Sequence, residues 1–299
     1  MTTRGDVQKA KLSLDGLSVG DAFGEQFFHP RARSLIAERF LPTGMWPWTD
    51  DTHMAISIVE HLQEFGEIDQ DKLAQLFAQR LVKDRRAGYA PSTWHMLERI
   101  YNGENWQEAA KSRFRGGSFG NGAAMRAAPI GGYFASDLKT TAYQARLSAQ
   151  VTHAHPEGIA GAIAIAVAAA LAANADSSAE ITDPGLIQGA YFIEKVLDFV
   201  PQGEVAGRLE AAMRIPPDSF NQAVIQLGSG QLVTAQDTVP FCIWVASHHL
   251  LDFEQALWQT VAGLGDRDTT CAMVGGIVAL SAQNIPAEWI KRREPLPPI

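Results

Sequence analysis

Apolar residues recur at helical spacing along most of the chain. Two segments show a period of three or four residues most clearly, through Ile56, Val59, Leu62 and Phe65, and through Leu73, Leu76, Phe77 and Leu81. This spacing places the apolar side chains on one face of an amphipathic helix. Further helices, bounded by Gly, Pro, Asn and Asp, are predicted at about 8–20, 92–101, 122–130, 137–149, 157–173, 184–199, 203–213, 239–250, 252–263 and 269–281.

No segment carries the signal of a β-hairpin. The Asn121-Gly122 pair stands among glycines and small residues rather than between two alternating strands, so it is predicted to be a loop that enters a helix. No internal repeat, heptad series or low-complexity linker divides the chain. The pattern therefore predicts an all-α protein in which residues 1–299 form a single compact domain.

The two most unusual stretches of composition fit this architecture. The most apolar run, residues 159–173, is mostly alanine and is shorter than the roughly 20 residues needed to cross a bilayer. We therefore expect a buried core helix and no membrane contact. The proline-rich tail, residues 294–299, is predicted to be extended, because proline lacks the amide donor that a helix needs.

Charge and cysteine content narrow the classes of function. The 299 residues carry 33 acidic and 25 basic side chains, and no Lys/Arg cluster is longer than residues 291–293. A duplex nucleic acid is therefore an unlikely partner, whereas a nucleotide-sized ligand is compatible with the composition. Cys242 and Cys271 are too few for a disulfide framework, and the first residues lack the apolar core of a signal peptide. We expect a cytoplasmic protein.

Candidate chemistry lies in five short polar segments that interrupt the apolar pattern. They are residues 20–25 (GDAFGE), 48–52 (WTDDT), 116–122 (GGSFGNG), 152–155 (THAH) and 265–269 (GDRDT).

Two of the segments offer oxygen ligands at the start of a predicted helix. Thr49-Asp50-Asp51 and Asp266-Arg267-Asp268-Thr269 each combine two carboxylates with a hydroxyl. Helix capping explains either segment alone. Together they exceed what two caps require, and an oxygen-rich set suits Mg²⁺ or Mn²⁺ rather than Zn²⁺. If the two helix starts converge, they form a two-metal site.

Two further polar segments contain a glycine-rich loop that could bind phosphate and a pair of histidines whose role the sequence does not determine. Residues 116–122 contain glycines that let the backbone approach a ligand and direct amide donors at phosphate oxygens ahead of a helix. The loop matches neither the P-loop nor the dinucleotide-binding pattern. His153 and His155 precede the alanine-rich helix. At this place a histidine caps the helix, packs in the core or contacts a ligand, and the sequence does not choose among these roles.

The five segments, in this order, resemble the ADP-ribosylglycohydrolase family from about Leu12 to Leu280. The most specific motifs are residues 20–24 (GDAFG), 49–51 (TDD), 120–126 (GNGAAMR), 145–153 (ARLSAQVTH) and 265–269 (GDRDT). The resemblance implies a compact all-α domain that holds two Mg²⁺ ions, with Mn²⁺ as the alternative. It also implies cleavage of the glycosidic bond that joins ADP-ribose to an acceptor such as an arginine side chain.

Matched position by position, the resemblance assigns roles to individual residues. The positions of the family's metal ligands are Thr49, Asp50, Asp51, Asp266, Asp268 and Thr269. The positions of its phosphate-binding loop are Gly117, Ser118, Gly120, Asn121 and Gly122, and His153 corresponds to a histidine beside the ADP-ribose. Candidates to stack on adenine or to shape the acceptor pocket are Trp46, Trp48, Phe119 and Phe28.

Two positions depart from the family pattern. Several members have a functional glutamate where this chain has Phe28, and Glu25, three positions earlier, either takes that role or is a surface carboxylate. Asp50, Asp51 and Glu25 are thus the candidate proton acceptors for an attacking water. Arg267 replaces a threonine, and it either pairs with a substrate phosphate or a metal-bound carboxylate or points to solvent.

These observations predict a Mg²⁺-dependent hydrolase that removes ADP-ribose from an acceptor, most simply by reversing mono-ADP-ribosylation of protein arginine. The glycosidic bond at the distal ribose would break through an oxocarbenium-like transition state. One alternative is hydrolysis of another ADP-ribosylated acceptor or of a small molecule that contains ADP-ribose. Another is a protein of the same fold that binds ADP-ribose without cleaving it. Retention of all six metal-ligand positions favours the enzyme.

Overall fold

A computed structural model describes residues 5–85, 88–112, 116–175 and 188–299. The described residues form helices and connecting loops, and none of them belongs to a β-strand. Two isolated bridges, Trp46 with Arg293 and Gly120 with Thr234, are the β-type pairings among them. The prediction of an all-α fold is confirmed.

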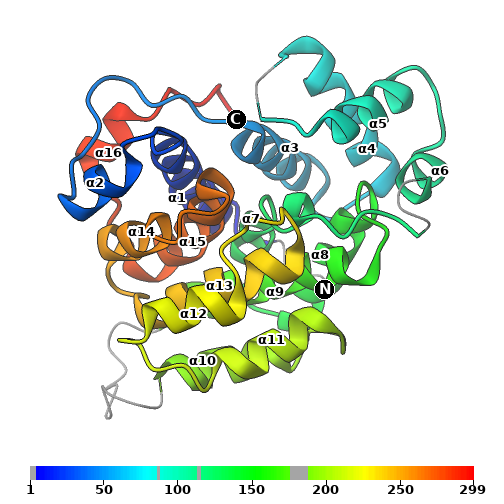
Figure 1. Ribbon diagram of the computed structural model, residues 1–299. Coiled ribbons are helices and arrows are strands. Elements are labelled where there is room, and N and C mark those ends of the chain that lie inside the picture. The colour runs from blue at the N-terminus through cyan, green and yellow to red at the C-terminus, as the bar shows by residue number, and fades with distance from the viewer. Residues whose placement is uncertain (1–4, 86–87, 113–115, 176–187) are drawn as a thin grey trace.

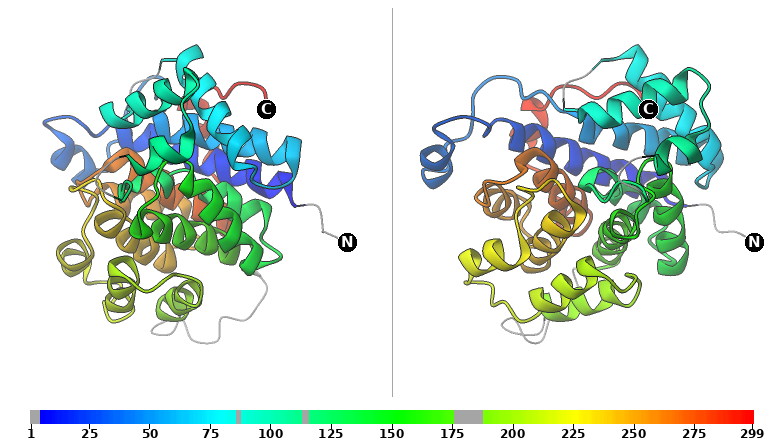
Figure 2. Two further views of the ribbon diagram at one scale, coloured as in Figure 1. Left: turned by 90° about the vertical axis from the view of Figure 1, so that its right-hand side faces the viewer. Right: turned by 45° about the vertical axis from the view of Figure 1, so that its right-hand side comes forward.

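The helices follow one another along the described chain with short connections. In order they are α1 (Val7–Glu25), α2 (Ala32–Ala37), α3 (Asp50–Phe65), α4 (Gln70–Lys83), α5 (Pro91–Tyr101), α6 (Trp106–Lys111), the 3₁₀ turn η1 (Asn121–Ala123), α7 (Ala128–Tyr133), α8 (Leu138–Gln150), α9 (Pro156–Ala173), α10 (Gln188–Leu197), α11 (Glu204–Ala212), α12 (Phe220–Leu227), α13 (Ala235–His248), α14 (Phe253–Val261), α15 (Arg267–Ala282) and α16 (Ala287–Arg292). Helices α4–α6 lie on one side of the central helices and α10–α12 on the opposite side (Figures 1 and 2).

Helices α1 and α15 pack closely at the centre of the molecule (Figure 1). A Cβ atom at Gly16, Gly20 or Gly24 would lie 2.3, 2.0 or 2.2 Å from a backbone oxygen of α15. The glycines recur every four residues, so they form a side-chain-free strip along one face of α1. This strip brings Asp21, on α1, beside the first turn of α15.

The alanine-rich helix α9 is the buried core helix that the sequence predicts. It is the one described helix that is long and apolar enough to cross a membrane, yet 78% of it is buried inside the protein. It packs against α7, α8, α13 and α15. Small side chains allow this close packing, because a Cβ atom at Gly131 of α7 would lie 2.1 Å from the carbonyl oxygen of Ala166.

Several helix boundaries differ from those predicted. Helix α1 continues to Glu25 rather than ending near residue 20, and residues 122–130 form η1 and the start of α7 rather than one helix. Pro129 explains the break, since proline occupies the first turn of α7, where its missing amide costs nothing. Of the helix predicted at 184–199, residues 184–187 lie outside the described residues, and α10 covers the next part.

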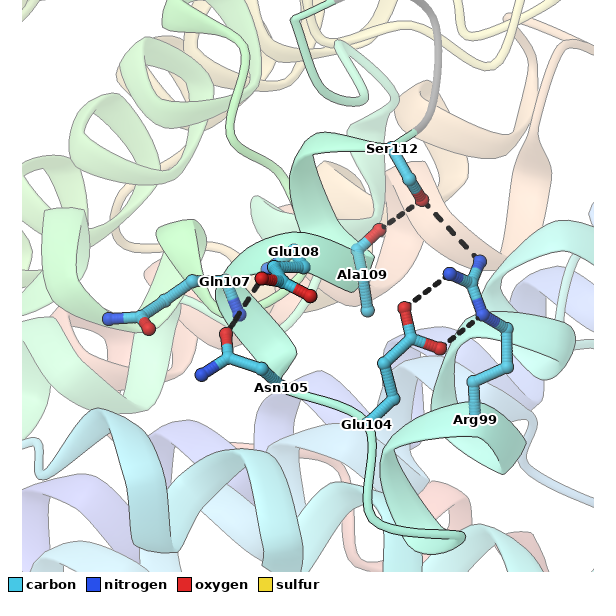
Figure 3. A network of polar contacts seen from close by, with 7 residues as sticks. All are labelled: Arg99, Glu104, Asn105, Gln107, Glu108, Ala109 and Ser112. Carbon is cyan, nitrogen blue, oxygen red and sulfur yellow. Dashed lines mark hydrogen bonds and ion pairs between the residues drawn. The ribbon is translucent and has the colours of Figure 1, made fainter.

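Four short helices, α2, α6, α12 and α16, have no counterpart among the predicted elements. Helix α6 illustrates why short helices escape a periodicity argument, because local polar contacts hold it. Asn105 Oδ1 accepts hydrogen bonds from the amides of Gln107 and Glu108, and Arg99 pairs with Glu104 (Figure 3). Such a cap stabilises one or two turns without an apolar stripe.

The C-terminal segment forms backbone hydrogen bonds with the loop that precedes α3. The amide of Trp46 donates to the carbonyl of Arg292 (2.6 Å), and the amide of Glu294 donates to the carbonyl of Trp46 (2.8 Å). Residues 294–299 contain no helix or strand, as predicted. The C-terminal segment therefore holds this loop at Trp46, three residues before Thr49.

Candidate metal centre and ligand cavity

The first turns of α3 and α15 meet beside α1. The hydroxyl of Thr269, on α15, donates to Asp51 Oδ2, on α3, over 3.3 Å. The hydroxyl of Thr49 donates to the same carboxylate over 3.1 Å and to Asp21 Oδ1 over 2.9 Å. The two carboxylate segments singled out in the sequence thus converge in space.

Asp21 holds the start of α3 from a different helix. Its carboxylate accepts hydrogen bonds from the amide and hydroxyl of both Thr49 and Thr52, at 2.5–3.1 Å. Thr49 itself makes no side-chain cap on α3, so Asp21 does the capping in its place. Asp21 was not among the predicted site residues, although its Gly-Asp-x-x-Gly motif was part of the resemblance.

Three carboxylates form an acidic triad in which Asp21 and Asp51 are buried and Asp268 is half-buried. Asp21, Asp51 and Asp268 each place an oxygen within 4.8 Å of the others. Asp51 Oδ1 and Asp268 Oδ1 are buried and accept no hydrogen bond from the described residues. Buried carboxylate oxygens without a donor are costly, and a divalent cation with oxygen ligands satisfies them. The residues present therefore fit a metal ion.

The electrostatics of the cluster support the same conclusion. Burial, reinforced by the charges of neighbouring carboxylates, raises the pKa of Asp51 and of Asp268 well above the ordinary range. Burial and the charges of Asp21, Asp266 and Glu25 raise the pKa of Asp50 to about 8. Each shift means that the ionised cluster is unfavourable by itself, and a bound cation reverses that balance.

The glycine-rich loop and the carboxylate segments line one cavity of about 270 Å³. Asp50, Asp266, Asp268 and Thr269 form one end, and residues 118–122 contribute the phosphate-loop wall. Asn121 joins the two parts, since its Nδ2 donates to Asp266 Oδ2 over 2.7 Å. Thr49 and Asp51 do not line this cavity; they lie buried beneath it, and Gly117 packs against residues 154 and 155.

The structure separates the two histidines of the polar segment 152–155. His153 is buried and lines the cavity. His155 is the N-cap of α9, and its Nδ1 accepts a hydrogen bond from the amide of Glu157 over 3.1 Å. The capping role thus belongs to His155, and the position in the cavity wall belongs to His153.

Glu25 lies one turn after Asp21 on the same face of α1. It is half-buried, and burial together with the charge of Asp21 raises its pKa. It does not line the cavity, although its charge contributes to the raised pKa of Asp50. Phe28, at the position where the family resemblance implies a functional glutamate, is half exposed, and its ring lies 4.8 Å from the guanidinium carbon of Arg267.

Arg267 binds two backbone carbonyls. Its guanidinium donates to the carbonyl of Phe27 (3.1 Å) and to the carbonyl of Leu264 (2.9 Å), and the residue does not line the cavity. It therefore connects the segment after α1 to the loop before α15. These contacts differ from the three alternatives that the sequence left open, and a contact of Arg267 with a substrate stays a prediction.

Only one of the four candidate aromatic residues lines the cavity. Phe119 belongs to the cavity wall and packs edge-on against His155. Trp46 and Trp48 are buried, Trp46 against Phe23 and Trp48 against His53. Both belong to the hydrophobic core.

A cavity wall that the sequence did not predict comes from the loop between α12 and α13. Leu232, Val233 and Thr234 line the cavity, with Leu232 69% and Val233 53% exposed at its mouth. The carbonyl of Val233 accepts from the amide of Asn121 (3.2 Å), which fixes this loop to the phosphate loop. The segment lacks polar residues in a recognisable pattern, so no sequence signal pointed to it.

The chain matches a family model described as ADP-ribosylglycohydrolase over residues 3–296. It therefore belongs to the ADP-ribosylglycohydrolase family, as the motifs indicated. It is 30% identical over 268 residues to ADP-ribosylhydrolase ARH3 of Homo sapiens, with 81% of this chain and 73% of that protein aligned.

Two further comparisons bear on substrate and fold. The chain is 28% identical over 247 residues to ADP-ribosylarginine hydrolase Tri1 of Serratia proteamaculans (strain 568), covering 73% of this chain and 65% of that protein. A solved structure described as an ADP-ribosylglycohydrolase-related protein complex superposes with a TM-score of 0.59 and 23% identity over 96% of this chain and 93% of that one. At this identity the likeness concerns the fold alone.

Proposed function

We propose that this protein is a Mg²⁺-dependent hydrolase that releases ADP-ribose from ADP-ribosylated arginine side chains of proteins. The observation that carries the proposal is the single cavity that joins a carboxylate cluster to a glycine-rich loop. Such a cavity matches two neighbouring parts of ADP-ribose, the central pyrophosphate and the distal ribose whose anomeric carbon reacts. Membership of the family and the similarity to two named ADP-ribosyl hydrolases support it.

The donor set determines which residues would hold the cations. Asp51 and Asp268 each offer a buried oxygen to which no described residue donates a hydrogen bond, and Asp50, Asp266, Thr49 and Thr269 lie around them. Both oxygens of Asp21 accept hydrogen bonds from Thr49 and Thr52, so Asp21 mainly orients the residues that would bind the metal. When bound, Mg²⁺ supplies positive charge that orients ribose hydroxyls and acidifies water.

The residues of the chain account for binding and proton transfer. The loop of residues 118–122 holds the pyrophosphate, which places the anomeric carbon at the carboxylate end of the cavity. Water attacks that carbon as the bond to the arginine nitrogen breaks through an oxocarbenium-like transition state, and the departing nitrogen takes up a proton in place of the one that the water gives up. Asp50 lines the cavity and accepts the proton of the water, with Glu25 behind it as a further acceptor.

The acidic cavity favours a cationic acceptor. Asp50, Asp266 and Asp268 all face the space that the acceptor side chain would enter. An ADP-ribosylated guanidinium carries positive charge, whereas a serine linkage is neutral, so the carboxylate charge that bound Mg²⁺ leaves uncompensated favours the arginine linkage.

The linkage is tested by measuring ADP-ribose release from an arginine-linked and a serine-linked protein substrate, each with Mg²⁺, with Mn²⁺ and with EDTA. We expect release from the arginine substrate that EDTA abolishes, and slower release from the serine substrate. Release from serine alone would assign another acceptor to the same site. Binding of ADP-ribose without release from either substrate would favour a non-catalytic binder, the alternative that Phe28 at the glutamate position keeps open.

A further inference from the structure

A buried chain of hydrogen bonds connects Arg126 to the histidine of the cavity. Arg126 is fully buried, and its Nη2 donates to the hydroxyl of Thr152 (2.8 Å) and to the carbonyl of Ser148 (3.0 Å). The hydroxyl oxygen of Thr152 lies 2.8 Å from His153 Nδ1. Thr152 and His153 are also buried, so water does not compete for these contacts.

The chemistry of these groups determines the direction of each bond. A guanidinium only donates, so the Thr152 oxygen accepts from Arg126 and still has one hydrogen to give. A buried hydroxyl hydrogen needs an acceptor, and His153 Nδ1 is the acceptor in contact with it. Nδ1 is therefore unprotonated, and the neutral imidazole carries its hydrogen on Nε2.

Two glycines of the phosphate loop lie beside that Nε2 edge. A Cβ atom at Gly120 would lie 3.4 Å from His153 Nε2, and one at Gly122 would lie 3.3 Å from it. Gly120, Gly122 and His153 all line the cavity. Glycine at both positions thus keeps a methyl group away from the ring edge that faces the loop.

We propose that Arg126 and Thr152 are positioning residues that hold His153, in the cavity wall, as the Nε2–H tautomer, the form that donates a hydrogen bond to a phosphate or ribose oxygen. A phosphate oxygen only accepts, so the opposite tautomer would direct a lone pair of Nε2 against another lone pair. The identity of the ligand rests on the proposed function. The tautomer does not, because it follows from contacts of the protein alone.

Nitrogen NMR of the histidine rings in the full-length protein tests the relay without any ligand. We expect the wild-type His153 to carry its hydrogen on Nε2. Thr152→Val should abolish this preference, and Thr152→Ser should retain it. The matched control is Thr141→Val. Thr141, on α8, is buried like Thr152, but its hydroxyl donates to the carbonyl of Phe134 (2.9 Å).

Calorimetry with ADP-ribose on the same variants measures what the tautomer contributes. Thr152→Val should weaken binding about tenfold relative to Thr141→Val, the effect of losing one hydrogen bond to a charged group. Thr152→Ser should restore the affinity.

An Nδ1–H tautomer in the wild type would overturn the proposal, and so would an unchanged tautomer in folded Thr152→Val. The wild-type spectrum decides even if Thr152→Val does not fold. An Nε2–H tautomer that depends on Thr152, in a protein that neither binds nor cleaves ADP-ribose, would support the relay and contradict only the proposed function.

Discussion

Asp51 Oδ1 and Asp268 Oδ1 lower the stability of the metal-free fold. Both are buried, and no described residue donates a hydrogen bond to them. An uncompensated buried carboxylate costs several kcal/mol, more than a domain can easily lose. A bound cation would offset this cost. Removing one of the two charges should therefore raise the stability of the metal-free protein and lower its metal-dependent activity.

Asp268→Asn should therefore lower Mg²⁺-dependent turnover by at least about 100-fold and raise the free energy of unfolding of the metal-free protein by about 1–3 kcal/mol. The amide keeps the shape of the side chain and removes its charge. Turnover assays and urea unfolding in EDTA measure the two effects. Asp218→Asn, at an exposed position, is the control and should change neither. Full activity of Asp268→Asn would contradict the assignment of this carboxylate.

The proton acceptor can be distinguished by comparing two carboxylates. Asp50 lines the cavity and Glu25 does not. Asp50→Asn should thus reduce kcat by about 100-fold or more, the usual contribution of general base catalysis, whereas Glu25→Gln should reduce it less than about tenfold. Steady-state kinetics at saturating Mg²⁺ measure both. A larger loss in Glu25→Gln than in Asp50→Asn would transfer the role to Glu25.

The raised carboxyl pKa values predict how the effect of Mg²⁺ on stability changes with pH. In the metal-free folded state the pKa of Asp50 is about 8, above its unfolded value near 3.9, so the folded state binds more protons between these values. The metal-free protein should lose stability as pH rises through this window. Mg²⁺ binds the ionised carboxylates, so the increase in Tm that it causes should be larger at about pH 8 than at about pH 5. Equal increases at both pH values would contradict the account.

At the scale of elements, the packing of α1 on α15 positions the acidic triad. A pattern argument ends α1 near Gly20 because glycine and aspartate are poor helix formers, yet the helix continues through Asp21 to Glu25. Tertiary packing overrides propensity here, since the glycines face the backbone of α15. The same reason explains why Asp21 was missed: its carboxylate lies inside a helix, away from the helix starts where oxygen ligands were sought.

Gly20→Ala tests this packing directly. Its Cβ atom would lie 2.0 Å from the carbonyl oxygen of Cys271, a backbone atom that cannot move without shifting α15. Urea unfolding should show a loss of about 1–3 kcal/mol, and turnover should fall because Asp21 and Asp268 move apart. Gly207→Ala, in α11 with nothing within 4 Å, is the matched control and should be stabilising by about 0.4–1 kcal/mol. Equal stability of the two variants would contradict the role of the α1 glycines.

Local interactions explain the other elements that sequence patterns did not predict. Residues 122–130 contain helix formers, but Pro129 starts a new helix and Arg126 donates to the carbonyl of Gly122 (2.9 Å). Short helices such as α6 depend on a cap rather than on an apolar stripe. The loop before α13 carries Leu232 and Val233, whose side chains resemble those of any core segment. Their place at the cavity mouth depends on the fold.

At the scale of the whole molecule, the site is assembled from parts far apart in the sequence. The motifs predicted the all-α class, the family and a carboxylate cluster with a glycine-rich loop, because each short segment carries its own chemistry. Contacts such as Asn121 with Asp266 depend on how the helices pack, and no local pattern encodes them. Arg267 is an example of a contact that its sequence neighbours do not predict. It stands between two carboxylates in the sequence, and its guanidinium binds two backbone carbonyls.

The central claim is that one cavity holds both the cations and ADP-ribose. A crystal of the protein grown with Mn²⁺ and ADP-ribose, measured at the manganese absorption edge, tests it most directly. The account predicts anomalous peaks within coordination distance of Asp51 and Asp268, and the pyrophosphate against residues 118–122. A saturated crystal with no peak at these carboxylates, or with ADP-ribose bound elsewhere, would contradict it.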